Sequence, residues 1–129
     1  MSTDLEKLLQ HLQPHLHEGQ YVFCTVQQPA ALLITSAICS FREMEGTTII
    51  LKRELADEAG LDYSYVAAWI TLEVHSSLDA IGLTAAFSAA LAAEGMSCNV
   101  VAGYHHDHIF VDHGSASKAM AVLRGLSKP

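Results

Sequence analysis

The order of structural elements in the second half of the chain constrains its fold more than any other feature of the sequence. Residues 66–75 are largely apolar and predict a central strand. Apolar residues spaced as on one face of a helix follow, and Gly95 closes that helix. Two further strands and a last helix are predicted over residues 97–104, 108–111 and 115–126. This order makes most of a ferredoxin-like unit, an α+β fold with helices on one face of an antiparallel sheet.

The first half of the chain predicts a less complete set of the same elements. Leucines at one-turn spacing indicate a helix over residues 3–13, which Pro14 should end or bend. The other elements expected in this half are a strand over residues 21–26, strands over 37–44 and 47–52 that are joined at Gly46, and a short helix over 54–59.

Two units in tandem, residues 1–65 and 66–129, are therefore expected, with residues 62–65 as their junction. The sequence ends soon after the last predicted helix, so the second unit is expected to lack a last strand of its own. A strand from the first half or from a neighbouring chain would complete its sheet and cover an exposed edge.

Composition argues against several classes of function. The chain has 14 acidic and 7 basic residues and a formal net charge of −7, so it offers no basic face for nucleic acid or for an anionic membrane. No run of about 18 apolar residues predicts a membrane span, and the polar start does not resemble a signal peptide. The three cysteines Cys24, Cys39 and Cys98 are widely spaced, which predicts buried free thiols and a reducing cytoplasm.

The loop before the second predicted helix has the chemistry of a small-ligand site. The backbone N–H groups at a helix N-terminus favour a carboxylate, and the hydroxyls of Ser76 and Ser77 lie next to them. Asp79 could accept a hydrogen bond from an ammonium group, and Gly82 lets the backbone approach a ligand. These features together would suit an amino acid. The structural alternative is that both serines cap the helix and Asp79 complements its dipole.

The same stretch carries a family resemblance. Residues 74–103, which read VHSSLDAIGLTAAFSAALAAEGMSCNVVAG, resemble an ACT domain. The chain is similar in particular to short bacterial proteins that carry two ACT-like units. That similarity extends to residues 20–23, 43–47, 69–72 and 106–108. The sequence departs from the usual pattern of the family in two respects. His75, Ser76 and Ser77 occupy the usual place of an aspartate, and no catalytic domain is attached.

The resemblance implies a function and a site. ACT units are regulatory βαββαβ modules that bind amino acids or other small effectors, often at interfaces between paired units, which implies a homodimer. The implied ligand-binding residues are Ser76, Ser77, Leu78, Asp79, Ile81, Gly82, Leu83, Asn99, Val100 and Val101.

A second candidate feature is a cluster of histidines between the last two strands. On an extended chain His106 and His108 point to one side, and His105 and Asp107 point to the other. Imidazoles on one face, with His113 or another residue, could bind zinc or nickel or act as acid–base groups. The structural alternative is a polar hairpin turn.

The sequence therefore predicts a non-enzymatic sensor of a small effector, with no catalytic residues, no metal and no cofactor. Two alternatives stay open. One is a metal-binding protein or metal-dependent enzyme that uses His105, His106 and His108. The other is a ligand-free interaction module that docks its alanine-rich helix on a partner.

Overall fold

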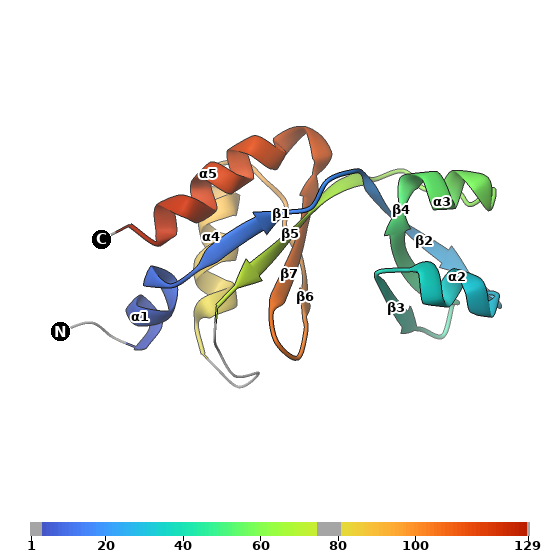
Figure 1. Ribbon diagram of the computed structural model, residues 1–129, viewed down its shortest axis with the longest axis horizontal. Coiled ribbons are helices and arrows are strands. Elements are labelled where there is room, and N and C mark those ends of the chain that lie inside the picture. Colours follow the sequence, from blue (N-terminus) through green and yellow to red (C-terminus); the bar gives the residue numbers. More distant parts are fainter. Residues whose placement is uncertain (1–3, 75–80, 129) are drawn as a thin grey trace. The chain divides into compact units, whose positions relative to one another are not determined.

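Strands and helices alternate along the chain and gather into two units. Unit 1 consists of residues 1–18 and 68–129, and unit 2 consists of residues 19–67. The computed structural model describes residues 4–74 and 81–128 (Figure 1). In chain order, unit 2 is therefore inserted into unit 1.

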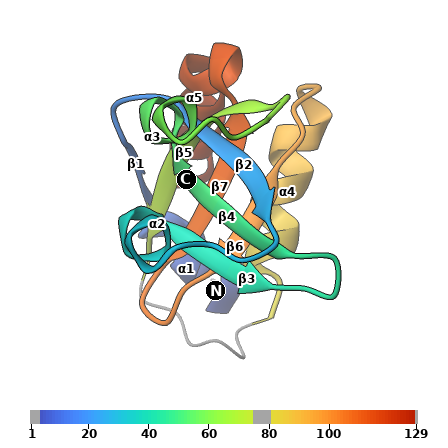
Figure 2. The ribbon, with the colours of Figure 1, turned by 90° about the vertical axis from the view of Figure 1, so that its right-hand side faces the viewer.

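Unit 2 contains a small antiparallel sheet and two short helices (Figure 2). Its elements are β2 (Tyr21–Val26), α2 (Ala31–Ser36), β3 (Cys39–Arg42), β4 (Thr47–Lys52) and α3 (Arg53–Glu58). β4 pairs with β3 on one side and with β2 on the other, and Val66 and Ala67 at the start of β5 (Val66–Glu73) pair with β2. With β5 as its last strand, unit 2 has the βαββαβ order.

The core of unit 2 follows from the register of β2 and β4. Val22 lies opposite Leu51 and Cys24 opposite Ile49, so these four buried side chains share one face of the sheet. Ala56 of α3 completes the cluster, and both helices add partly buried residues.

Unit 1 has the same arrangement with longer helices. Its elements are α1 (Asp4–Gln10), β1 (Gln13–Leu16), β5, α4 (Leu83–Ala93), β6 (Asn99–Ala102), β7 (Asp107–Asp112), a 3₁₀ turn (His113–Ser115) and α5 (Ala116–Leu126). The strand order is β1-β5-β7-β6. β1 pairs antiparallel with β5, so the missing last strand of this sheet comes from the start of the chain. Two ferredoxin-like units in one α+β chain confirm the predicted fold class.

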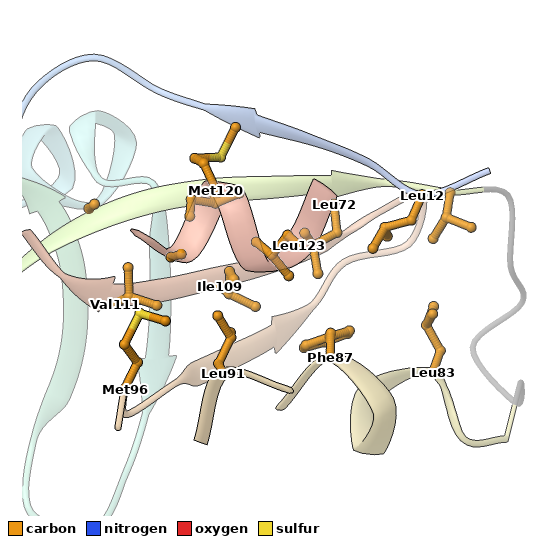
Figure 3. Packing of buried hydrophobic residues seen from close by; sticks show 14 residues of the cluster. Leu12, Leu72, Leu83, Phe87, Leu91, Met96, Ile109, Val111, Met120 and Leu123 are labelled. Atoms are coloured by element: carbon orange, nitrogen blue, oxygen red, sulfur yellow. The ribbon is translucent and has the colours of Figure 1, made fainter. Parts of the chain in front are cut away.

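The core of unit 1 lies between one face of its sheet and its helices. Alternate residues of β5 point into it, and so do residues spaced by four along α4 (Figure 3). The side chains of these two elements that belong to the core are Ala68, Ile70, Leu72, Leu83, Phe87 and Leu91. Ala119, Met120 and Leu123 of α5 pack against the same cluster. The helical spacing predicted for α4 is thus confirmed.

The C-terminal end of α4 is closed as the sequence predicted. Gly95 has φ 79°, and its N–H donates to the carbonyl oxygen of Ala92 at 2.9 Å. The N–H of Met96 donates to the carbonyl oxygen of Leu91 at 3.1 Å, and both side chains are buried. These two bonds form a Schellman motif with its hydrophobic contact.

The start of the chain differs from the prediction. The helix expected over residues 3–13 ends at Gln10, and residues 13–16 form β1 instead. Pro14 lies in this strand rather than merely ending a helix, and β1 is an edge strand, where a missing N–H is tolerated. Residues 1–18 therefore lie with residues 68–129, whereas the expected division placed them with residues 19–65. Helix α2 was not predicted.

The three cysteines are free, as predicted, but only Cys24 is buried. Cys39 and Cys98 are half-buried, and burial raises the pKa of the Cys98 thiol to about 11. Within residues 4–74 and 81–128, none of the helices combines the length and apolarity needed to cross a bilayer.

Candidate functional site

The N-terminus of α4 has the backbone geometry of an open helix end. Gly82 is its N-cap residue, with φ 95° and ψ −16°, and it makes no side-chain capping bond. The first hydrogen bond of the helix joins the Ala86 N–H to the Gly82 carbonyl oxygen at 2.9 Å. The N–H groups of residues 83–85 have no partner inside the helix. Any acceptor for them must therefore come from outside the helix.

Two side chains fix the position of this helix end. Leu83 is 3 % exposed in the core of unit 1, and a Cβ atom at Gly82 would lie 3.2 Å from Cδ2 of Leu5 on α1. The neighbouring Ile81 is 91 % exposed. Apolar packing of Leu83 and Leu5 thus fixes the start of the helix, while the neighbouring side chain of Ile81 faces solvent.

The other predicted residues of this loop, Ser76, Ser77, Leu78 and Asp79, lie outside the described residues, as does His75. The N-cap position itself belongs to Gly82 rather than to either serine. Of the loop residues predicted from the sequence, the structure therefore describes Ile81, Gly82 and Leu83.

The predicted residues on β6 lie near the other end of α4. Figure 3 shows Leu83 and Met96 at opposite ends of the helix, and Asn99 begins β6 three residues after Met96. Asn99 is exposed and Val101 is half-buried, while Val100 packs against the core of unit 1. Within one chain, Asn99 and Gly82 are therefore separated along the helix.

His105 and His106 lie in the turn between β6 and β7, as the structural alternative expected, and His108 lies in β7. The Gly103 N–H donates to the His106 carbonyl oxygen at 2.9 Å, and Tyr104 and His105 are exposed at the tip. A Cβ atom at Gly103 would approach this oxygen to 2.8 Å, so the turn requires glycine. Among the described residues, no three His, Cys, Asp or Glu side chains are placed to hold one metal ion. The metal hypothesis for His105, His106 and His108 gains no support.

His108 instead takes part in a network that the sequence did not reveal. Its Nδ1 accepts a hydrogen bond from the indole N–H of Trp69 at 3.1 Å and lies 3.1 Å from Oγ1 of Thr71. The same hydroxyl lies 2.7 Å from Nε2 of His17, whose ring stacks on Trp69 with centroids 3.5 Å apart. An indole N–H can only donate, so His108 must be neutral, with its proton on Nε2.

Burial and neighbouring imidazoles favour the neutral rings. Desolvation lowers the pKa of His108, and His106 lowers it further, although Asp107 acts in the opposite direction. Desolvation, His15 and His108 lower the pKa of His17, and Glu73 opposes them. The alternation of β5 could have indicated this network, since Trp69 and Thr71 fall on the face opposite the core. Nothing in the sequence places His17 beside them.

Comparison with family models identifies the family of the chain. A model described as ACT domain matches residues 2–68, and a second model with the same description matches residues 64–125. The chain belongs to the ACT-domain family. Its two matches in tandem confirm the resemblance seen in the sequence. No curated protein matches this ACT-domain protein.

Solved structures resemble this ACT-domain protein over most of its length. A crystal structure from Vibrio cholerae, described as a protein of unknown function and possible transport protein, is 47 % identical, with a TM-score of 0.87 and 96 % of each chain covered. A protein from Agrobacterium tumefaciens is 15 % identical, with a TM-score of 0.70 over 90 % of this chain and 89 % of that one.

A third solved structure, that of a regulatory subunit, has a similar fold. The ligand-free regulatory subunit of aspartate kinase from Thermus thermophilus is 10 % identical, with a TM-score of 0.66 over 90 % of this chain and 97 % of that one. At this identity the likeness shows the fold alone. Membership of the ACT-domain family supports a regulatory role that involves a small molecule.

Proposed function

We propose that this ACT-domain protein is a non-enzymatic sensor that binds an amino acid, or a similar effector, at the N-terminus of α4. The observation that carries the proposal is the start of this helix at Gly82, a glycine N-cap in a left-handed conformation. A helix N-terminus offers N–H donors and a partial positive charge to a carboxylate.

The neighbouring residues supply the rest of an amino-acid site. Ser76 and Ser77 would add hydroxyl donors, and Asp79 would accept a hydrogen bond from the ammonium group. Ile81 is exposed, so a bound side chain could cover it. Leu78 and Leu83 belong to the same segment and would support its backbone.

The β6 residues enter the proposal through a second copy of the chain. Asn99 begins β6 near the C-terminal end of α4, and Gly82 lies at the N-terminal end of that helix. Asn99 therefore does not approach Gly82 of the same chain. β6 is an edge strand of unit 1, and its exposed edge is suited to pairing. We propose a homodimer in which Asn99, Val100 and Val101 of one chain complete the site of the other. A monomeric mass by light scattering across micromolar concentrations would contradict it.

A thermal-shift screen of chelator-stripped protein tests the binding. The twenty amino acids and common divalent metals are added separately, and one amino acid is expected to raise the melting temperature saturably. A ligand at 100 times its dissociation constant stabilises the folded protein by roughly 2.7 kcal/mol.

A matched pair of variants locates the binding site. Gly82→Ala and Gly95→Ala each place a side chain at a residue with positive φ, at opposite ends of α4. The methyl group at Gly82 lies at the proposed site and also meets Cδ2 of Leu5 at 3.2 Å, whereas at Gly95 it meets no atom within 4 Å. The ligand-induced shift should be lost in Gly82→Ala and kept in Gly95→Ala.

The screen also separates the alternatives. Stabilisation by a metal alone would favour the histidine hairpin, and no stabilisation by any amino acid would favour an interaction module. Equal ligand responses in the two glycine variants would contradict a site at the start of α4. The free thiols suit a reducing compartment, and we propose the cytoplasm as the location.

A further inference from the structure

A groove of about 380 Å³ lies between β1 and α5 in unit 1. This volume is within the range of small-molecule sites. Six residues line it: Pro14, His15, Leu16, Ser117, Met120 and Arg124. None of them belongs to the proposed effector site at α4.

The fold leaves this groove open because the helices do not fully cover the last strand. Pro14 lies opposite Leu72, and Leu16 lies opposite Ile70, so all four side chains share the face of the sheet on which the helices pack. Ile70 and Leu72 have exposed fractions of 0 %, whereas Leu16 is 38 % exposed. At the groove, an apolar side chain on the covered face is therefore accessible to a ligand.

The other wall is one side of α5. Ser117, Met120 and Arg124 stand at positions i, i+3 and i+7, which align on one helix face. Met120 is 6 % exposed and forms apolar lining, and Ser117 and Arg124 are exposed. Within the described part of the chain, the guanidinium of Arg124 forms no ion pair with a carboxylate.

The edge of β1 adds a backbone donor. The His17 N–H donates to the Trp69 carbonyl oxygen at 3.0 Å, so residues 17 and 69 form a hydrogen-bonded pair. In an antiparallel ladder such pairs alternate, which turns the N–H of Leu16 away from β5. Pro14 has no N–H and blocks pairing with a further strand. The groove is thus suited to a small molecule rather than to a peptide strand.

We infer that this groove binds a short aliphatic carboxylate. A guanidinium pairs with a carboxylate through two hydrogen bonds, and the Leu16 N–H and Ser117 hydroxyl can donate to the same group. Pro14, Leu16 and Met120 provide apolar contacts for the carbon chain. No acidic side chain lines the groove, so no carboxylate there would pair with the charge of an ammonium group. This ligand class therefore differs from the amino acid proposed at α4, and the two sites are independent.

Titration of the full chain, followed by NMR of methyl-labelled methionine, tests the inference. The chain has four methionines: Met120 reports on the groove, and the fully exposed Met44 of unit 2 is an internal control. Acetate, butyrate and hexanoate should shift the Met120 signal saturably. Affinity should rise with length, by up to about fourfold per methylene group. Hexylamine and inorganic phosphate should leave the signal unchanged.

Two substitutions separate the carboxylate contact from a general charge effect. Arg124→Gln should weaken hexanoate binding at least about tenfold, because it removes a charge-assisted pair of hydrogen bonds. Lys128→Gln removes the same charge from a residue that does not line the groove, and it should leave binding unchanged.

Three results would overturn the groove site. One is the absence of a saturable Met120 shift, and another is equal binding by wild type and Arg124→Gln. The third is loss of hexanoate binding in Gly82→Ala with retention in Arg124→Gln, which would assign the carboxylate to α4. Failure of the amino-acid screen would leave the groove result unaffected.

Discussion

The sheets of units 1 and 2 have the same strand arrangement, but the two units differ greatly in the size of their cores and helices. The buried cluster of unit 1 contains 14 residues, and that of unit 2 contains five. The two main helices of unit 1 have 11 residues each, whereas those of unit 2 have six each. The comparison shows that the topology can be repeated in one chain without repeating the size of the core.

The corresponding helices α4 and α2 show what this difference means for binding. α4 starts at Gly82 with φ 95°, while α2 starts after Ala30 with an ordinary φ of −62°. Six residues make fewer than two turns, so α2 has a weak dipole. Unit 2 also leaves Leu32 and Phe41 exposed. We therefore place the proposed effector site in unit 1.

The largest expected effect comes from separating unit 1 from its first strand. Residues 66–129 alone lack β1 and the buried Leu12, so they should fail to fold cooperatively. Both chain ends belong to unit 1. A permuted chain, with residues 1–18 joined after residue 129 by a flexible linker, should restore a cooperative transition. Unfolding can be followed by the fluorescence of Trp69, the single tryptophan.

A permuted chain that carries a scrambled segment in place of residues 1–18 is the control. Equal cooperativity of this control and the intact permuted chain would show that β1 is dispensable. The boundary between the two units would then lie at residue 65 rather than at residues 18 and 67.

Local patterns were sufficient to predict most of the fold. The spacing of Leu83, Phe87 and Leu91 predicted α4, and the Gly95 terminus was also predicted. The strand over residues 21–26 was predicted with its observed bounds. These elements could be predicted because the apolar residues in each follow the period of a helix or of a buried strand.

The missed features depend on partners that are distant in the sequence. Residues 13–16 contain a proline and a histidine and form a strand only because β5 pairs with them. The network around His108 brings His17 next to β5 and β7, so no local pattern could assign His17 to it. Both features arise from tertiary structure, which local propensity does not encode.

The next largest effect compares the two cores directly. Phe87→Ala removes a ring with no exposed surface from α4 and should destabilise unit 1 by about 3–5 kcal/mol. Leu33→Ala, on the corresponding α2, removes a half-buried side chain and should cost only about 1–2 kcal/mol. Urea unfolding, followed by tryptophan fluorescence and circular dichroism, measures both. Equal losses would contradict the difference in core size.

The smallest expected effect is a pH dependence confined to unit 1. All eight histidines lie in residues 1–18 and 68–129, and none lies in unit 2. His17 and His108 have pKa values lowered from 6.5, so the folded state binds protons less readily than the unfolded state. Their contribution to stability is therefore present above pH 6.5 and is lost as the pH falls through the lowered values.

Stability measured by Trp69 fluorescence should thus decrease between pH 7.5 and 5.5, by less than about 1 kcal/mol because both rings are partly solvated. His108→Gln should reduce this slope, since an amide does not titrate and can still accept from the indole N–H. His113→Gln, at an exposed position outside the network, is the matched control and should keep the slope. Burial raises the pKa of Asp107 from 3.8. Protonation of this carboxyl at lower pH therefore favours the folded state, which is opposite to the effect of the two histidines. Identical slopes in the two variants would show that the network does not govern the response of unit 1 to acid.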